Sequence, residues 1–337
     1  MFDEINSFRT SPKEYYLKHK SLFQHIQGVD NLFEKIPPSP KIIWSDSLFR
    51  EAKAEGSSNS RNNGSFAKSF CGYAGFSTND KNPDSLINKV IRENFTTFLS
   101  PDYTHIGIYS NEVTYFNDKY KSIHVFIGTH CDAAKKQFEF SWKKVPETLA
   151  AVDMKRINTA ANEKYLAESE KEMIKEINFA RCYPAIYADI IANYLVSEGK
   201  TSFDTWLAGQ EIVEILKNLK PMKPLLPDSR LYQCAKNHGL DEKKRGYMGH
   251  TGSDNSSPFD RIRKVLGSSY LDGSENLVGD SSPRDAVIAL LIDGGIASRG
   301  HRENVIKLNW THVGCYFVGT VDDMPGCYVQ NFAEIKE

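Results

Sequence analysis

The sequence predicts an α+β fold, arranged as two tandem α-β-α sandwich domains in which helices flank an antiparallel sheet. The chain of 337 residues is long enough for two domains at roughly 150 residues each. Short motifs recur in the same order in its two halves, which is typical of a duplicated module. In each half, helical patterns come first and strand patterns last, which favours helices packed on an antiparallel sheet.

The clearest repeated motif is E-I-N-x-x-R-x-x-P, which begins at Glu4 and again at Glu176. Arg92-Glu93-Asn94 recurs as Arg302-Glu303-Asn304, and Thr104-His105-Ile106-Gly107 recurs as Thr311-His312-Val313-Gly314. A further match pairs Leu48-Phe49 with Leu231-Tyr232. Matches in one order favour a tandem duplication. The second copy is longer before its R-E-N motif, in the stretch that contains His250 and Glu275.

Local patterns predict the elements of the second copy. Ser169-x-x-Glu172 has the capping-box pattern of a helix start, and Pro184 suits the first turn of the next helix. Apolar composition and spacing predict helices at 231–240 and 285–292, and strands at 313–318 and 327–332. We expect a first domain at 1–140, a helical connector at 141–168 and a second domain at 169–337.

Composition excludes several classes of function. A formal net charge of -1, with no basic stripe, argues against a nucleic-acid-binding protein. The longest apolar run, Ala286–Ile292, is far short of the roughly 20 residues that cross a bilayer. The first residues include Asp3 and Glu4 and have no apolar stretch of the secretory type, so we expect a cytoplasmic protein.

The six cysteines form no C-x-x-C pair. We expect reduced, mostly buried thiols at Cys71, Cys131, Cys182, Cys234, Cys315 and Cys327. The alternative is an exported protein in which Cys315 and Cys327 pair across a hairpin.

The second copy resembles a CAP domain, of the superfamily of cysteine-rich secretory, antigen-5 and pathogenesis-related-1 proteins (SCP/TAPS). The resemblance is carried by several motifs in family order: Asn178-x-x-Arg181-x-x-Pro184, Gly249-His250-Thr251-Gly252, Ser257-Pro258-Phe259-Asp260-Arg261, Ser274-Glu275-Asn276-Leu277, Gly300-His301-Arg302-Glu303-Asn304 and Tyr328-Val329-Gln330-Asn331-Phe332. The resemblance implies an α-β-α sandwich.

The resemblance also implies a cleft lined by two histidines and two acidic residues that can hold a divalent cation. The candidates are His250, Glu275 and His301, with Asp293 as the only acid near the position of the second carboxylate. Such groups suit zinc or another borderline cation, and they could also transfer protons. The alternative is structural: His250 caps a loop and His301 bonds the backbone at a helix start. Further motif residues are expected to have structural roles: Asn178, Arg181, Pro184, Arg261, Asn276 and Arg302.

Two other features are interpreted as structural rather than functional. His238 shares a helix face with Leu231 and Cys234 and is expected to be a satisfied, partly buried histidine. In the first copy no His or Glu occurs between Gly56 and Ile91, and Ile91 stands directly before the R-E-N motif, where the second copy has His301. The first copy therefore has the pattern of a degenerate CAP-like domain without cleft groups.

The leading hypothesis is a non-enzymatic, intracellular binding or scaffolding component, with other proteins as partners. A cytoskeletal or ciliary assembly is one such setting. The first alternative is binding of a divalent metal or of a small apolar molecule, such as a sterol or lipid, in the second domain. The second alternative is a metal-dependent hydrolase or peptidase that uses His and Glu on a bound water.

Overall fold

The computed structural model describes residues 1–24, 26, 29–58, 70–80, 83–115, 118–130, 137–280, 282–296, 298–321 and 323–336. The chain divides into two compact units. Unit 1 consists of Met1–Phe140 and Glu198–Glu211, and unit 2 consists of Ser141–Ser197 and Ile212–Glu337.

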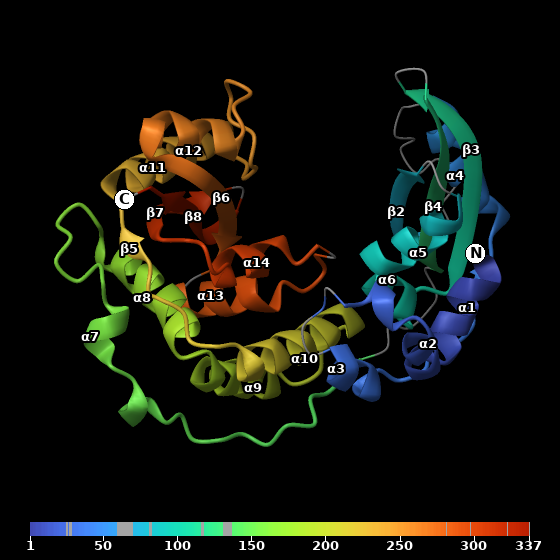
Figure 1. Ribbon diagram of the computed structural model, residues 1–337, viewed down its shortest axis with the longest axis horizontal. Coiled ribbons are helices and arrows are strands. Elements are labelled where there is room, and N and C mark those ends of the chain that lie inside the picture. The colour runs from blue at the N-terminus through green and yellow to red at the C-terminus, as the bar shows by residue number, and fades with distance from the viewer. Residues whose placement is uncertain are drawn as a thin grey trace. The chain divides into compact units, whose positions relative to one another are not determined.

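Unit 1 combines a row of helices with a four-stranded sheet (Figure 1). Its helices are α1 (Phe2–Thr10), α2 (Pro12–Lys18), the 3-10 helix η1 (Lys20–Leu22), α3 (Val29–Lys35), α4 (Asp46–Ser58), α5 (Pro83–Glu93) and α6 (Phe95–Leu99). Its strands are β1 (Ile43–Trp44), β2 (Phe70–Asp80), β3 (His105–Tyr115) and β4 (Asp118–His130). The sheet order is β1-β3-β4-β2.

Unit 2 has a sheet of the same order, β5-β7-β8-β6. Its strands are β5 (Leu226–Pro227), β6 (Tyr270–Gly279), β7 (His312–Val321) and β8 (Met324–Ile335). Its helices are η2 (Leu149–Ala151), α7 (Met154–Ile157), α8 (Glu168–Cys182), α9 (Pro184–Glu198), α11 (Ser229–Arg245), α12 (Pro258–Leu266), η3 (Gly267–Ser269), α13 (Pro283–Ile292) and α14 (Gly300–Ile306). Helix α10 (Phe203–Asn218) has residues in both units.

The sheets are mixed, whereas the sequence predicts purely antiparallel sheets. In each unit the two-residue edge strand runs parallel to its neighbour, β1 to β3 and β5 to β7, while the other pairs are antiparallel. Two residues are too few to give a periodic signal in the sequence, so these edge strands were not predicted.

Helices cover both faces of the unit 2 sheet. Successive residues of a strand point to opposite faces, and the amide of Gln330 on β8 lies 3.0 Å from the sulfur of Met173 on α8. On the other face, α11 packs so closely on β7 that a Cβ at Gly314 would overlap the backbone of Leu231 and Tyr232. Gly107 on β3 allows the same close approach of α4 in unit 1.

The repeated N-x-x-R motif makes equivalent contacts in the two units. The side chain of Asn178 on α8 bonds both backbone groups of Leu225, and that of Asn6 on α1 bonds both backbone groups of Ile42. The matched arginines are completely enclosed, and burial lowers the pKa of each to about 10. Arg181 donates to the carbonyls of Val305, Lys307 and Trp310, and Arg9 donates to those of Phe98, Ser100 and Tyr103.

Helix α8 begins earlier than its predicted capping box. The helix starts at Glu168, and the carboxylate of Glu170 accepts a hydrogen bond of 2.6 Å from the N–H of Ala167. Ser169 therefore lies inside the first turn, because Glu170 and not Glu172 reaches back to the preceding backbone. Pro184 is the first residue of α9, as its sequence pattern predicts.

The predicted helical connector at 141–168 contains little helix. Only η2 and the four-residue α7 are helical, and the rest of the segment is irregular. Its side chains are nonetheless part of the packing of unit 2, with Ile157 and Ala160 fully buried. Contacts to α8 and not local propensity hold this segment in place.

Residues from the second half of the chain complete the core of unit 1. Phe203 and Leu207 of α10 are completely buried there, and the indole N–H of Trp206 donates to the carbonyl of Glu139 over 3.2 Å. A β-bridge pairs Phe138 with Thr201. The expected domain limits do not include this inserted segment.

Ile91 does not occupy the place of His301, contrary to the prediction. Ile91 lies in the last turn of α5 and is fully buried in the core, whereas His301 lies in the first turn of α14. Arg181 donates to the carbonyl of Val305 and Arg9 donates to that of Phe98, so Val305 and Phe98 are equivalent positions. His301 lies four residues before Val305, and the residue four positions before Phe98 is Asn94. The shared letters R-E-N therefore stand at different places in the two units.

The disulfide alternative is wrong for the described cysteines. Cys315 pairs with Gln330 and Cys327 pairs with Gly319, so the two residues lie at distant points of the hairpin. Four buried cysteines are free thiols: Cys182, Cys234, Cys315 and Cys327. The side chains of Cys71 and Cys131 lie outside the described residues. No helix in the described part is long and apolar enough to cross a bilayer.

Candidate functional site

Helix α11 and strand β6 provide the buried half of the site. The carboxylate of Asp228 caps the first turn of α11, and Gly246, with φ +73°, ends the helix in the left-handed conformation. Between these ends, His238 and Glu242 are one turn apart on the face that packs on the sheet. Strand β6 brings Glu275 to the same face.

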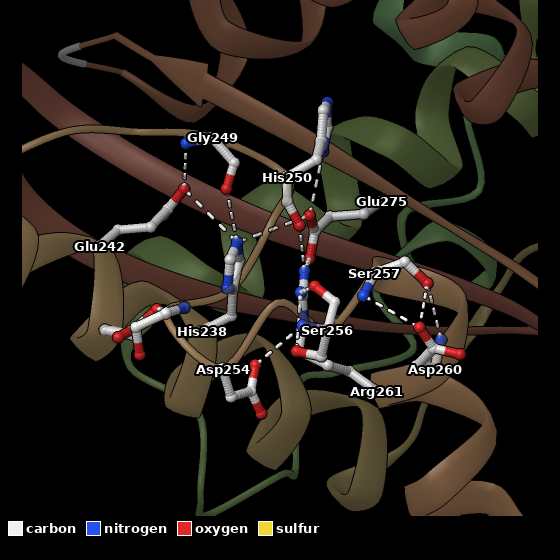
Figure 2. A network of polar contacts seen from close by, with 12 residues as sticks. His238, Glu242, Gly249, His250, Asp254, Ser256, Ser257, Asp260, Arg261 and Glu275 are labelled. Atoms are coloured by element: carbon white, nitrogen blue, oxygen red, sulfur yellow. Dashed lines mark hydrogen bonds and ion pairs between the residues drawn. The ribbon is translucent and has the colours of Figure 1, made fainter.

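Glu275 is almost completely buried and accepts hydrogen bonds from two cationic or ionisable side chains (Figure 2). Its Oε1 lies 3.0 Å from Nδ1 of His250, and its Oε2 accepts a 2.8 Å bond from Nη2 of Arg261. The His250 side chain is half exposed. A buried carboxylate therefore orients an imidazole that faces solvent.

Arg261 also holds the loop that carries His250. Its guanidinium donates to the carbonyls of Ser256 over 2.9 Å and of His250 over 3.0 Å. Ser257 and Asp260 bond each other reciprocally at the start of α12, which places Arg261 on the first turn, facing the loop. The loop is thus tied to Glu275 through one side chain.

His238 and Glu242 hold Gly249, the residue before His250 (Figure 2). The Glu242 carboxylate accepts from the N–H of Gly249 over 2.9 Å, and Nε2 of His238 lies 3.0 Å from the Gly249 carbonyl. Burial raises the pKa of Glu242 to about 7 and lowers the pKa of His238. His238 is more deeply buried than expected, and among the described residues its Nδ1 has no hydrogen-bond partner.

The role of Glu242 was missed from the sequence. The available signal was its spacing of four residues from His238 on the apolar face that also contains Leu231 and Cys234. Ionisable residues are rarely fully buried unless paired, so two of them on the buried face indicate a buried polar network.

His301 forms a second pair with Asp293. Oδ1 of Asp293 lies 2.9 Å from Nδ1 of His301, while its Oδ2 accepts from the backbone N–H of His301 over 3.0 Å. Asp293 has φ +53°, ends α13 and is buried. The same residue thus terminates one helix, caps the next and orients an imidazole.

Arg302 and Asn276 complete this region. Arg302 donates to the carbonyls of Leu291 and Ile292 at the end of α13, both over 2.7 Å. Asn276, next to Glu275 on β6, donates to the carbonyl of His301 over 3.1 Å and accepts from Asn304. The two histidine–carboxylate pairs are therefore linked through β6 and α14.

The structure places the four candidate residues as two pairs, His250 with Glu275 and His301 with Asp293. Among the described residues, no group of three or more His, Cys, Asp or Glu side chains could hold a metal ion. In each pair the carboxylate contacts Nδ1, which leaves Nε2 as the ring atom that can contact a ligand or a proton.

Comparison with known proteins finds one family model that matches part of this chain. Residues 177–332 match the model of CAP, the cysteine-rich secretory protein family. The uncharacterised protein YkwD of Bacillus subtilis is 32% identical over 109 residues, which cover 32% of this chain and 40% of YkwD. The chain thus spans about two fifths of the length of this curated relative.

Two solved structures are among those found to be similar. An outer surface protein from Borrelia burgdorferi is 23% identical, with a TM-score of 0.29, over 34% of this chain and 80% of that chain. An extracellular protein from Bacillus anthracis that contains an SCP domain is 16% identical, with a TM-score of 0.29, over 68% of this chain and 60% of that chain. The likeness to the CAP family rests on the family model, which matches residues 177–332.

Proposed function

We propose that this chain is a non-enzymatic binding protein, with a CAP domain that presents His250 and His301 to a ligand or partner. The observation that carries the proposal is the state of Glu275. Both of its oxygens are engaged, one by His250 and the other by the Arg261 guanidinium. A general base must reach a bound water, and the Glu275 side chain is 1% exposed and bonded on both oxygens.

The partner is proposed to be another protein in a larger intracellular assembly. The four described cysteine side chains are free thiols, which supports a reducing compartment. In native extracts, size-exclusion chromatography should recover the protein well above its monomer mass of 38.1 kDa. The double substitution His250→Ala and His301→Ala should shift it towards that mass if these two histidines make the contact. Elution of the wild-type protein as a monomer contradicts the proposal.

Binding of a divalent cation is the second candidate function. Two imidazoles whose Nδ1 atoms are held by carboxylates match a common arrangement in which the carboxylate orients a histidine ligand from outside the coordination sphere. His250 and His301 would hold the ion through Nε2, and Glu275 and Asp293 would orient them. Calorimetry with zinc should then give heat with the wild-type chain and none with His301→Ala, whereas equal heats exclude the site.

A metal-dependent hydrolase is the weakest of the three. It requires peptidase activity that chelation abolishes and that Glu275→Gln destroys. Peptidase activity that is unchanged by chelation and by Glu275→Gln excludes a metal-dependent hydrolase. An apolar ligand has less support: a cavity of about 350 Å³ in unit 2, apart from His250 and His301, is lined mainly by polar and charged side chains, including Lys144, Asn193 and Arg284.

We further propose that unit 1 is a degenerate copy of the CAP domain, kept for its surface. The shared sheet order and the equivalent contacts of Asn6 and Asn178 support this view. Gly75 has the register position on β2 that Glu275 has on β6, and the ring of Phe126 occupies the space next to it. An apolar ring thus stands where the second unit has its buried carboxylate.

A further inference from the structure

Unit 1 has an open groove between α1 and the edge strand β1. The groove has a volume of about 640 Å³, which is in the range of ligand-binding sites. Helix α1 contributes Asn6, Ser7 and Thr10 to its walls, and the edge strand contributes Ile43 and Trp44. The side chains of Ile43 and Trp44 are 58% and 41% exposed, which is unusual for adjacent large apolar residues.

The equivalent groove of unit 2 lies between α8 and β5. The two grooves correspond because Asn6 bonds Ile42 as Asn178 bonds Leu225, next to the edge strand in each case. Thr10 in the wall of the first groove corresponds to Cys182 of α8 through the same repeated motif.

In unit 2 this groove is filled by the chain's own segment 156–159. Ile157 is completely buried, and its carbonyl accepts a 3.1 Å bond from Nδ2 of Asn178. The hydroxyl of Thr159 donates to the carbonyl of Leu225 over 2.8 Å and also lies 3.0 Å from Nδ2 of Asn178. An aliphatic residue and a threonine two positions later thus fill the groove and satisfy its asparagine.

The corresponding groups of unit 1 lack these partners. Among the described residues, the Asn6 side chain bonds only to the backbone of Ile42, and its Nδ2 contact is long, at 3.4 Å. Asn178 makes three bonds with its Nδ2 where Asn6 makes one. The first groove therefore keeps hydrogen-bonding capacity that the second has used.

The edge strands of the two units also differ in their free hydrogen-bonding groups. Ile43 and Ser45 donate their N–H groups towards β3, to Thr104 and Ile106, so the N–H of Trp44 points away from the sheet. The same position in unit 2 is Pro227, which has no N–H and blunts the edge. The edge of unit 1 is thus open to a further extended chain.

We propose that the groove of unit 1 binds an extended peptide segment of a partner protein, with an aliphatic residue two positions before a threonine. The aliphatic side chain enters the groove as Ile157 does in unit 2, and the threonine hydroxyl donates to the carbonyl of Ile42. The peptide backbone pairs with the N–H of Trp44, which is a form of β-strand addition. The chain's own segment 156–159 is already bound in unit 2, so the occupant comes from another molecule.

A fluorescent peptide with the sequence of residues 153–160 tests the proposal on the full chain. We expect saturable binding by fluorescence anisotropy. The same peptide with Ile157→Asp should bind at least tenfold more weakly, because a carboxylate would replace the aliphatic side chain that packs on Ile43 and Trp44. In the protein, Ser7→Trp should abolish binding, because the new ring on an exposed position of α1 fills the groove.

Ser268→Trp, at an exposed position in unit 2, is the matched control and should bind like the wild type. Equal thermal unfolding midpoints for the two variants would show that both are folded. Absence of saturable binding, or equal binding of the Ile157→Asp peptide, overturns the proposal. Binding that survives Ser7→Trp also overturns it, because the peptide would then have exchanged into the groove of unit 2.

Discussion

Glu242 illustrates how one buried residue contributes to the pH dependence of this fold. Its side chain is inaccessible to solvent, and burial raises its pKa from 4.5 to about 7. A carboxyl with a higher pKa in the folded chain than in the unfolded chain destabilises the fold as pH rises. The cost grows between pH 4.5 and pH 7 and is complete above that range. A shift of this size corresponds to about 3 kcal/mol.

Glu242→Gln should remove this cost. The amide oxygen can still accept from the N–H of Gly249, so the loop contact survives. We expect the free energy of unfolding to rise by about 1–3 kcal/mol at pH 8 and to change much less at pH 5. Urea denaturation at both pH values measures this, with the exposed Glu303→Gln as control. The lowered pKa of His238 acts in the opposite sense. A pH-independent gain would contradict the argument.

Arg181 is the residue whose replacement should cost most in unit 2. Its guanidinium fork bonds several carbonyls around the segment after α14, and a lysine ammonium cannot span them. Arg181→Lys should lower the free energy of unfolding by about 2–4 kcal/mol, because buried carbonyls lose their donors. Arg230→Lys, at an exposed ion pair with Asp228, should change it by less than about 0.5 kcal/mol in the same urea titration. Similar losses in both variants would contradict this role.

At the scale of elements, Asp293 connects α13 to α14. Asp293→Ala removes the acceptor at the start of α14 and places in the left-handed conformation a residue whose side chain cannot hydrogen-bond locally. We expect a loss of about 2 kcal/mol in stability, from the cap and the backbone together. Asp293→Asn should cost less than about 1 kcal/mol, because asparagine both caps helices and tolerates positive φ. Chemical denaturation measures the free energy of unfolding of the two variants. Equal losses of stability would show that the cap is not the cause.

Element positions followed the sequence wherever the signal was local. Helix α13 and strands β7 and β8 were predicted because Pro283, an apolar helical run and alternating β-formers mark them within a few residues. The start of α8 was misplaced because Ala167, the residue before the helix, has no capping side chain and gives no signal in the sequence. Residues 141–168 were predicted as helix, but their order comes from burial of Ile157 against another element.

At the scale of the molecule, α10 ties residues of the second half of the sequence into the first unit. Phe203→Ala should cost about 3–5 kcal/mol in the core of unit 1. Hydrogen exchange should therefore show lost protection in β3 and β4, although the substitution lies beyond residue 200, while β7 and β8 stay protected. The matched variant Leu216→Ala, at a buried position of α10 in unit 2, should give the reverse pattern. The same pattern from both variants would contradict the division.

The sequence by itself indicated that the second copy resembles a CAP domain, and it named His250, Glu275, Asp293 and His301 as the candidate groups. It did so because capping residues, helical periodicity and motif spacing are properties of neighbours along the chain. Only the tertiary structure decided that these four form two pairs, that Arg261 donates a hydrogen bond to Glu275 and that Glu242 is buried beside Gly249. Those facts depend on contacts between residues far apart in sequence, whose partners are chosen when whole helices and strands pack.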